Sequence, residues 1–92
     1  MIKSFQHKGL EKLFIEDNRS KIDPEHAAKL LRILDRLDVA TGPQDMNLPC
    51  YKLHKLKGSY KNTWAVWVSG NWRITFQFKG QDAVNVNYQD YH

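Results

Sequence analysis

The spacing of apolar residues changes near the middle of this chain, and that change constrains the fold more than any other feature. Before residue 40, apolar residues recur every three or four positions, which is the period of an amphipathic helix. After Pro49 they alternate with polar residues, which is the period of a β-strand. Because 92 residues have room for one domain, the two periods predict a single α+β domain over residues 1–92, with helices packed on one face of an antiparallel sheet.

The first half predicts a short strand and two helices. Ile2–Phe5 alternates and predicts a short N-terminal edge strand, and residues 8–16 carry apolar residues at helical spacing. The second helix is predicted to begin at Asp23 as its N-cap, with Pro24 in the first helical position. It is predicted to end before Thr41-Gly42-Pro43.

The second half predicts three to four antiparallel strands. Gly70-Asn71 is a hairpin signal between two alternating segments. Pairing Val68 with Trp72 gives a three-residue loop and places Trp67 opposite Arg73, so that the apolar sets match. The predicted strands are residues 51–56, 64–69, 72–78 and 83–91.

Alternation also predicts which side chains share each face of the sheet. The set predicted to face the helices is Trp64, Val66, Val68, Trp72, Ile74, Phe76, Phe78, Val84, Val86 and Tyr88. The set predicted for the outer face is Trp67, Arg73, Thr75, Ala83, Asn85, Asn87, Gln89 and Tyr91. An arginine, two aromatic rings and several amides suit single-stranded RNA, which needs a cation for phosphate, rings for stacking and amides for base edges. An ordinary polar sheet face, or a surface covered by a protein partner, is the alternative.

The positive charge is confined to the second half of the chain. The net charge is +4, yet residues 1–49 hold eight basic and eight acidic residues, whereas residues 50–92 hold six basic and two acidic ones. Such asymmetry indicates a polyanionic partner such as nucleic acid, with a solvated surface as the plainer interpretation.

The sequence also predicts where the protein acts. One cysteine, Cys50, permits no internal disulfide and no cysteine-based zinc site. Met1–Leu10 contains no apolar run typical of a signal peptide, and no segment has the length of a membrane span. We therefore expect a cytoplasmic protein that does not associate with a membrane. No histidine spacing matches a zinc motif, so neither a metal nor a cofactor is expected.

Cleavage of RNA without a metal requires three chemical groups. A base removes the 2′-hydroxyl proton, a cation stabilises charge on the phosphate, and an acid protonates the leaving 5′-oxygen. Histidine can play either proton role near neutral pH. The second half supplies the candidates His54, Lys57, Arg73, Asp90, Tyr91 and His92. Each taken alone also fits an ordinary structural or solvated position.

Three segments together resemble a known family. They are Tyr-Lys-Leu-His-Lys-Leu-Lys-Gly over residues 51–58, Asn-Trp-Arg-Ile-Thr-Phe over 71–76, and Asn-Tyr-Gln-Asp-Tyr-His over 87–92. The sequence closely resembles HigB toxins, the host-inhibition branch of the RelE/ParE superfamily, from end to end. The resemblance implies a RelE-like fold and cleavage of mRNA in the aminoacyl site of the ribosomal 30S subunit. It also implies a HigA-like helix-turn-helix antitoxin as partner.

The resemblance further implies the site residues and their roles. Positions matching the family's active residues are His54, Lys57, Asn71, Arg73, Asp90, Tyr91 and His92. We hypothesise that His92 transfers protons with help from Asp90 and His54, that Arg73 and Lys57 hold the scissile phosphate, that Tyr91 stacks on or positions a base, and that Asn71 reads a base edge. Further RNA contacts are assigned to Lys52, Lys55, Trp67 and Gln89. Asp90 and His92 have the strand parity of the core-facing residues, so they require a twist or an early strand end to reach the outer face.

Two other functions fit the same fold. A ParE-like toxin that poisons DNA gyrase would need neither His92 nor an ordered Arg73. A binding-only or inactivated relative is the third interpretation, which the retained His54, Arg73 and His92 disfavour.

Overall fold

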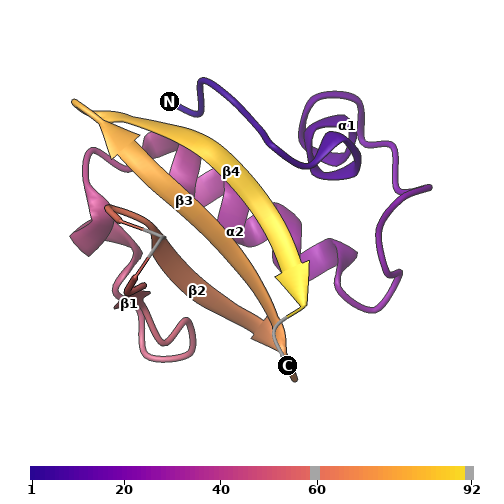
Figure 1. Cartoon of the computed structure of the whole chain (residues 1–92). Coiled ribbons are helices and arrows are strands. Elements are labelled where there is room, and N and C mark those ends of the chain that lie inside the picture. The colour runs from indigo at the N-terminus through magenta and orange to yellow at the C-terminus, as the bar shows by residue number, and fades with distance from the viewer. Residues whose placement is uncertain (59–60, 91–92) are drawn as a thin grey trace.

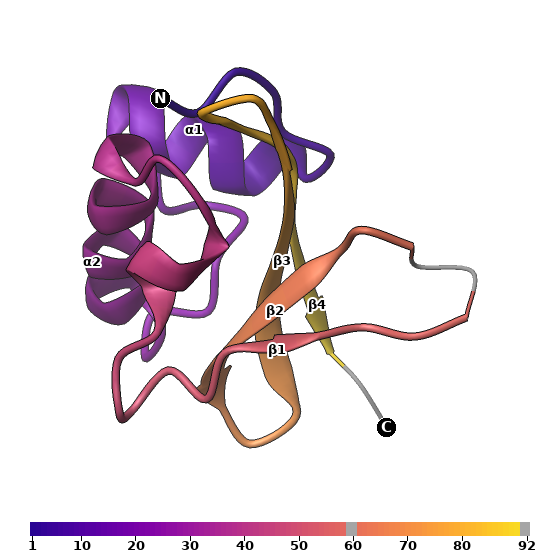
Figure 2. The same cartoon turned by 90° about the vertical axis from the view of Figure 1, so that its left-hand side faces the viewer.

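The computed structural model describes residues 1–58 and 61–90 and has the predicted α+β architecture. Two helices precede four strands. The strands form an antiparallel meander in the order β1-β2-β3-β4, and the helices cover one of its faces (Figures 1 and 2). The elements are α1 (Lys8–Glu16), α2 (Ala27–Val39), the 3-10 turn η1 (Pro43–Met46), β1 (His54–Lys55), β2 (Trp64–Ser69), β3 (Trp72–Lys79) and β4 (Asp82–Asp90).

Helix α1 has the predicted bounds, and its ends explain them. The N-cap is His7, whose Nδ1 accepts the amide hydrogen bond of Leu10 at 3.0 Å. This bond satisfies one of the amide donors that a first helical turn leaves without a partner. At the other end Asp17 adopts a left-handed conformation, with φ 54°, and its amide closes the last turn.

Helix α2 begins later than predicted. Asp23 was expected as its N-cap, but the helix begins at Ala27 with His26 in the cap position. The Asp23 carboxylate instead accepts the amide of Glu25 at 2.9 Å, and its carbonyl accepts the amide of His26, so residues 23–26 form a separate turn. A residue that caps a turn and one that caps a helix use the same local hydrogen bond, which is why the sequence did not distinguish them.

The core lies between the two helices and the helix-facing side of the sheet. From α1 and α2 it takes an apolar stripe that includes Leu10, Leu34 and Leu37, all fully buried. The sheet contributes Val66, Ile74 and Phe76, which are also fully buried. The two layers appear edge-on in Figure 2, where the helices stand on one side of the sheet. The chain that follows β1 and the chain that leads into β2 extend on the other side.

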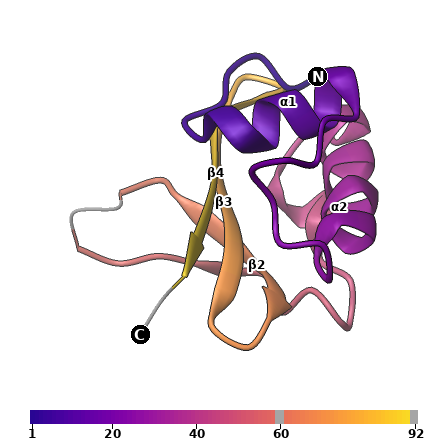
Figure 3. The same cartoon turned by 90° about the vertical axis from the view of Figure 1, so that its right-hand side faces the viewer.

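The N-terminal segment is not a full strand. Ile2 and Phe5 each form one parallel bridge to β4, at Ala83 and Val86. The predicted edge strand is therefore correct in place, at the β4 edge of the sheet (Figure 3), but is reduced to two bridges. The predicted strand 51–56 is likewise reduced to His54–Lys55.

Two irregularities correct the predicted faces of the sheet. In the β2–β3 pairing Ser69, not Val68, lies opposite Trp72, because the register shifts between Trp67 and Ser69. In the β3–β4 pairing a second shift accompanies Asn85, which has φ 54°. Before that shift the side-chain parity is inverted.

As a result of the second shift, Ala83 lies opposite Phe78 and is buried, whereas Val84 lies opposite Gln77. Both residues were predicted on the other face. A β-bulge inserts one extra residue in one strand, so every side chain before it exchanges faces.

Candidate nucleic-acid interface

A row of three side chains crosses the outer face near one end of the sheet. Trp67 of β2 lies opposite Arg73 of β3, and Arg73 lies opposite Gln89 of β4. All three are half-buried. Directly opposed residues share a face of the sheet, so the structure confirms that Trp67, Arg73 and Gln89 share the outer face, as predicted.

A second row runs parallel to the first. His54 of β1 lies opposite Ala65, Ala65 opposite Thr75, and Thr75 opposite Asn87. Ala65 and Thr75 are small and buried, at 0% and 4% exposure, while His54 and Asn87 at the ends of the row are half-buried. Two rows of the outer face therefore hold a cation, an imidazole, an indole and two amides.

The imidazole of His54 has a defined tautomer. Its Nδ1 lies 3.0 Å from the carbonyl oxygen of Lys52. A carbonyl only accepts hydrogen bonds, so Nδ1 must carry the proton, and Nε2 is left as the acceptor in the neutral ring. This is the arrangement that a general base requires.

Trp67 is partly covered by two lysines of the same chain. The ammonium of Lys29 on α2 lies 4.3 Å from the centre of the indole ring, and that of Lys52 lies 4.6 Å from it. The indole N–H donates to the Gly70 carbonyl at 2.9 Å. The side chain is thus held in place by its neighbours, and two cations lie over the residue that is paired with Arg73.

Lys29 also anchors the bulge that sets this register. Its ammonium donates to the carbonyl of Val68 at 2.7 Å, and Val68 is the residue at which the β2–β3 pairing shifts. Helix α2 therefore contributes directly to the geometry of the outer face. Lys29 was not predicted from the sequence, because no local pattern links residues 39 positions apart.

The remaining candidates divide by position. Asn71 is exposed in the turn between β2 and β3, at the same end of the sheet as Trp67 and Arg73. Asp90 is exposed and lies opposite Trp72, so it has helix-facing parity, as the alternation predicted. Tyr91 and His92 follow Asp90 directly and lie outside the described residues.

Lys55 and Lys57 are not brought to the row of Arg73. Lys55 lies opposite Trp64, with its ammonium 5.9 Å from that ring, which places it on the helix-facing side. Lys57 is exposed and lies beyond β1, where the amide of Leu56 still donates to Thr63. Antiparallel pairing then puts Lys57 on the side of His54 away from Trp67, as much as about 10 Å along an extended chain.

An aromatic cluster on the helix-facing side of the sheet holds the start of β3 and the end of β4 in place. Tyr88 stacks on Trp72 with ring centres 4.5 Å apart, and its hydroxyl hydrogen-bonds His26 Nδ1. Burial, followed by the negative charges of Asp23 and Asp90, raises the pKa of Tyr88 to about 12. The hydroxyl therefore remains protonated. Through this cluster, the start of β3 and the end of β4 contact the residue that precedes α2.

No group of three or more potential metal ligands from histidine, cysteine, aspartate and glutamate occurs within residues 1–58 and 61–90. In the described part of the chain, no helix is both long and apolar enough to cross a membrane.

Two helices on one face of a four-stranded antiparallel meander, with the opposite face left polar and cationic, is the arrangement of a RelE-like fold. The model of the family described as the RelE-like toxin of type II toxin–antitoxin system HigB matches residues 3–92, and the chain belongs to that family. A protein named endoribonuclease HigB from Proteus vulgaris is 45% identical over 92 residues, which is the full length of both chains.

Proposed function

We propose that this protein is an endoribonuclease that cuts mRNA on the translating ribosome and thereby arrests translation. Membership of the HigB family supports the toxin class, and the name of the Proteus vulgaris relative supports the activity. The observation that carries the proposal is the position of Arg73. It lies in the middle strand of the three-residue row, between an indole and an amide, on the face that the helices leave open.

The proposed reaction is an internal displacement at phosphorus. The 2′-oxygen of the RNA bonds to the adjacent phosphorus as the bond to the 5′-oxygen breaks. One group removes the proton from the 2′-hydroxyl, and another delivers a proton to the leaving oxygen. A fixed cation beside the phosphate stabilises the charge that develops on its oxygens. Every proton and charge in this scheme is handled by side chains, so we propose that it needs no metal.

The roles follow the order of the residues across the site. Arg73 binds the scissile phosphate, and His54 assists proton transfer through its unprotonated Nε2. His92 is the principal proton-transfer group, oriented by Asp90, and Tyr91 positions a base. These three assignments are supported by the family resemblance and by the place of Asp90 at the end of β4, next to Gln89 in the Arg73 row.

The remaining roles concern RNA binding. Trp67 and Gln89 contact bases beside the scissile phosphate, and Asn71 reads a base edge. Lys52 binds backbone phosphate close to Trp67. Lys57, which lies beyond His54, is better placed for a neighbouring phosphate than for the scissile one, and Lys55 contacts RNA only from the other side of the sheet edge.

The decisive experiment removes the cation and the principal proton-transfer group separately. Cleavage of an mRNA programmed on ribosomes should fall about 10²–10³-fold for Arg73→Ala and about 10²–10⁴-fold for His92→Ala. Arg32→Ala is the matched control, because Arg32 is an exposed arginine of α2 in the helical layer. If both site variants cleaved mRNA at the wild-type rate, the proposed ribonuclease function would be refuted.

Ribosome dependence needs its own measurement. Purified protein should cut mRNA efficiently with ribosomes present and poorly without them, and efficient cleavage of naked RNA would contradict this part of the proposal. Elemental analysis should find no stoichiometric transition metal in the active protein.

Two further experiments test the alternative function and the partner. Supercoiling by purified gyrase should proceed unchanged in its presence, whereas a ParE-like toxin would inhibit it. We further propose that the protein acts in the cytoplasm and that a HigA-like helix-turn-helix antitoxin, encoded by a neighbouring or overlapping reading frame, neutralises it. Co-expression of that reading frame should restore growth.

A further inference from the structure

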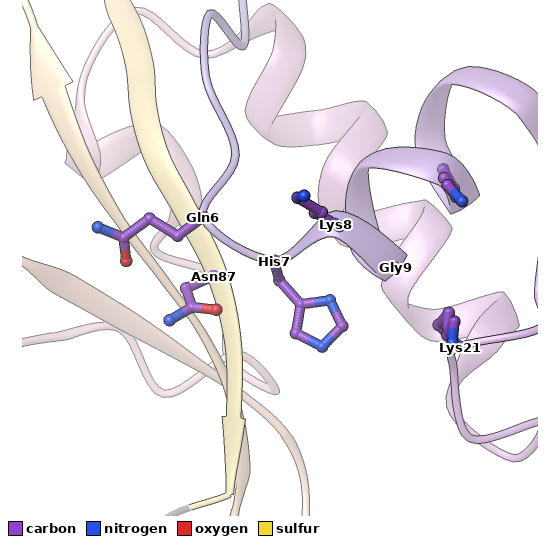
Figure 4. A pocket seen from close by; sticks show the side chains of 7 residues that line it. Gln6, His7, Lys8, Gly9, Lys21 and Asn87 are labelled. Carbon is purple, nitrogen blue, oxygen red and sulfur yellow. The ribbon is translucent and has the colours of Figure 1, made fainter.

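A pocket of about 480 Å³ opens at the β4 edge of the sheet, away from the Arg73 row. It lies between the N-terminal segment, the start of α1 and the loop that precedes α2 (Figure 4). Three lysines line it, two from α1 and one from the loop, together with His7, Gly9 and Asn87. Among the described residues, none that was assigned a catalytic or RNA-binding role from the sequence lines this pocket.

The pocket concentrates positive charge without a counter-charge. Lys8 and Lys12 are four positions apart on α1, which places them on one side of the helix, and Lys21 reaches the same space from the loop. No acidic residue occurs among the described residues that line the pocket. Among the described residues none of the three lysines forms an ion pair. Like charges repel, so this convergence suits an anion that occupies the space between them.

The close approach of the Lys21 loop to α1 depends on Gly9. A Cβ at this position would lie 2.5 Å from the Cβ of Lys21 and 2.9 Å from Cε1 of His7. Since the first of these atoms is fixed to the main chain, only glycine lets the loop approach α1 so closely. The position of Lys21 beside α1 is therefore set by packing, not by the freedom of a long side chain.

His7 contributes a neutral donor to the same space. Its Nδ1 accepts the Leu10 amide, so the proton of the neutral ring is on Nε2. Burial lowers the pKa of His7, which keeps the ring neutral. No described residue accepts a hydrogen bond from Nε2. The pocket thus offers one directed N–H donor besides three ammonium groups.

Asn87 connects the pocket to the outer face. It lines the pocket and also ends the row formed by His54, Ala65 and Thr75. From the strand of Arg73 to the pocket beyond β4 is about two strand spacings, roughly 10 Å. An RNA that runs from Arg73 across β4 would therefore pass close to the three lysines.

From these observations we propose that the pocket formed by Lys8, Lys12, Lys21, His7 and Gly9 binds a phosphate group of RNA, as an anchor separate from the site of cleavage. This inference rests on the proposed ribonuclease function. The phosphate belongs either to the transcript that crosses the outer face or to the structured RNA of the ribosome. Both present the same chemistry to the pocket.

The test measures the number of phosphate contacts from the salt dependence of binding. The variant is Lys8→Gln/Lys12→Gln/Lys21→Gln, and the matched control is Lys3→Gln/Lys61→Gln/Lys79→Gln, which removes the same charge from exposed lysines outside the pocket. The probe is a twelve-nucleotide single strand with 2′-O-methyl groups, which cannot be cut by the proposed reaction. Each contact to a single strand contributes about 0.7 to the slope of log K against log salt.

If the transcript fills the pocket, the slope should fall by about 2 in the pocket variant and remain unchanged in the control. If ribosomal RNA fills it, the short strand should bind both variants equally, while co-sedimentation with ribosomes should weaken at least about tenfold for the pocket variant alone. Either result supports an RNA phosphate. Equal behaviour of the two variants in both assays would overturn the proposal.

Two further outcomes would also overturn it. Unchanged RNA binding with weakened antitoxin binding would show that the lysines receive carboxylates of a protein. If the wild-type protein bound neither the short strand nor ribosomes, an RNA phosphate would also be ruled out as the ligand of the pocket. The proposed function has a separate readout, because wild-type cleavage by Arg73→Ala would refute the proposed cleavage site without changing the difference in salt slope between the two triple variants. Denaturant unfolding of both triple variants verifies that they are folded.

Discussion

At the scale of single residues, Gly9 and Gly42 form a natural comparison. Alanine at Gly9 brings its Cβ within 2.5 Å of another Cβ, whereas at Gly42 it meets no atom within 4 Å. Gly42 is also in extended backbone, with φ −173°, which alanine adopts freely. We expect Gly9→Ala to lower the free energy of unfolding by about 1–3 kcal/mol, the usual cost of overpacking, and Gly42→Ala to change it little. Urea denaturation measures both, and equal stability of the two variants would contradict the close approach of Lys21.

The cap of α1 predicts a pH dependence of stability. The pKa of His7 is lowered in the folded protein from an ordinary value of 6.5, so the unfolded chain takes up a proton first as the pH falls. This cap therefore stabilises fully above about pH 6.5 and is lost below it, as pH approaches the lower folded pKa. Asparagine at the cap accepts the same amide hydrogen bond but does not titrate.

Between about pH 7.5 and about pH 5.5, His7→Asn should therefore lose less unfolding free energy than the wild type. The difference should stay below about 1 kcal/mol, the typical worth of a cap, because the half-exposed ring is screened by solvent. Parallel loss in both proteins would show that other groups dominate acid sensitivity.

The candidate site could be predicted from sequence only where its residues lie on regular strands. Alternation alone placed Trp67 beside Arg73, and the register confirms it. Lys8 and Lys12 carried a usable signal, their spacing of four on a helix. The contribution of Lys21 and Lys29 depends on contacts between segments far apart in the chain, and no local pattern contains that information.

At the scale of elements, the bulge in β2 determines the register of the outer face. Lys29 donates to the carbonyl of Val68 and lies over Trp67, whereas Lys52 only lies over Trp67. Methionine keeps most of the side-chain length without the ammonium. Lys29→Met should cost about 1–2 kcal/mol through the lost hydrogen bond, and Lys52→Met at most about 1 kcal/mol, the cation–π contribution.

Catalysis gives this prediction a second readout. If the bulge positions Trp67 opposite Arg73, Lys29→Met should lower kcat for ribosome-dependent cleavage, and Lys52→Met should mainly raise KM through a lost phosphate contact. A Lys29→Met protein that is as stable and as active as the wild type would show that the bulge persists without its anchor.

The elements themselves were largely predictable, and the errors in the faces of β4 have one physical origin. Helix α1 and strands β2 and β3 follow strong periodic patterns and were placed to within a residue. The faces of Ala83 and Val84 were wrong because a single bulge at Asn85 inverts the parity before it. A bulge changes no residue type in the pattern, so an alternation that remains intact along β4 still predicts the wrong face.

At the scale of the whole molecule, the sheet separates stability from the proposed activity. Its helix-facing side packs the core, whereas the Arg73 row lies on the other side. Leu34→Ala removes a side chain that is fully buried and should lower the free energy of unfolding by about 2–5 kcal/mol. Arg73→Ala removes a half-buried side chain on the outer face and should change stability by much less.

Activity should show the opposite order. A domain of this size has roughly 5–14 kcal/mol of stability, so Leu34→Ala remains folded at low temperature and should cut mRNA at close to the wild-type rate there. Arg73→Ala should melt normally and cut mRNA about 10²–10³-fold more slowly. The two sites face away from each other across the sheet, so their effects on unfolding free energy should add in the double variant to within about 0.5 kcal/mol. Thermal melting and cleavage below the melting range measure both quantities. An Arg73→Ala protein that melts as early as Leu34→Ala would mean that the outer face also holds the fold together, and its slower cleavage would then say nothing about catalysis.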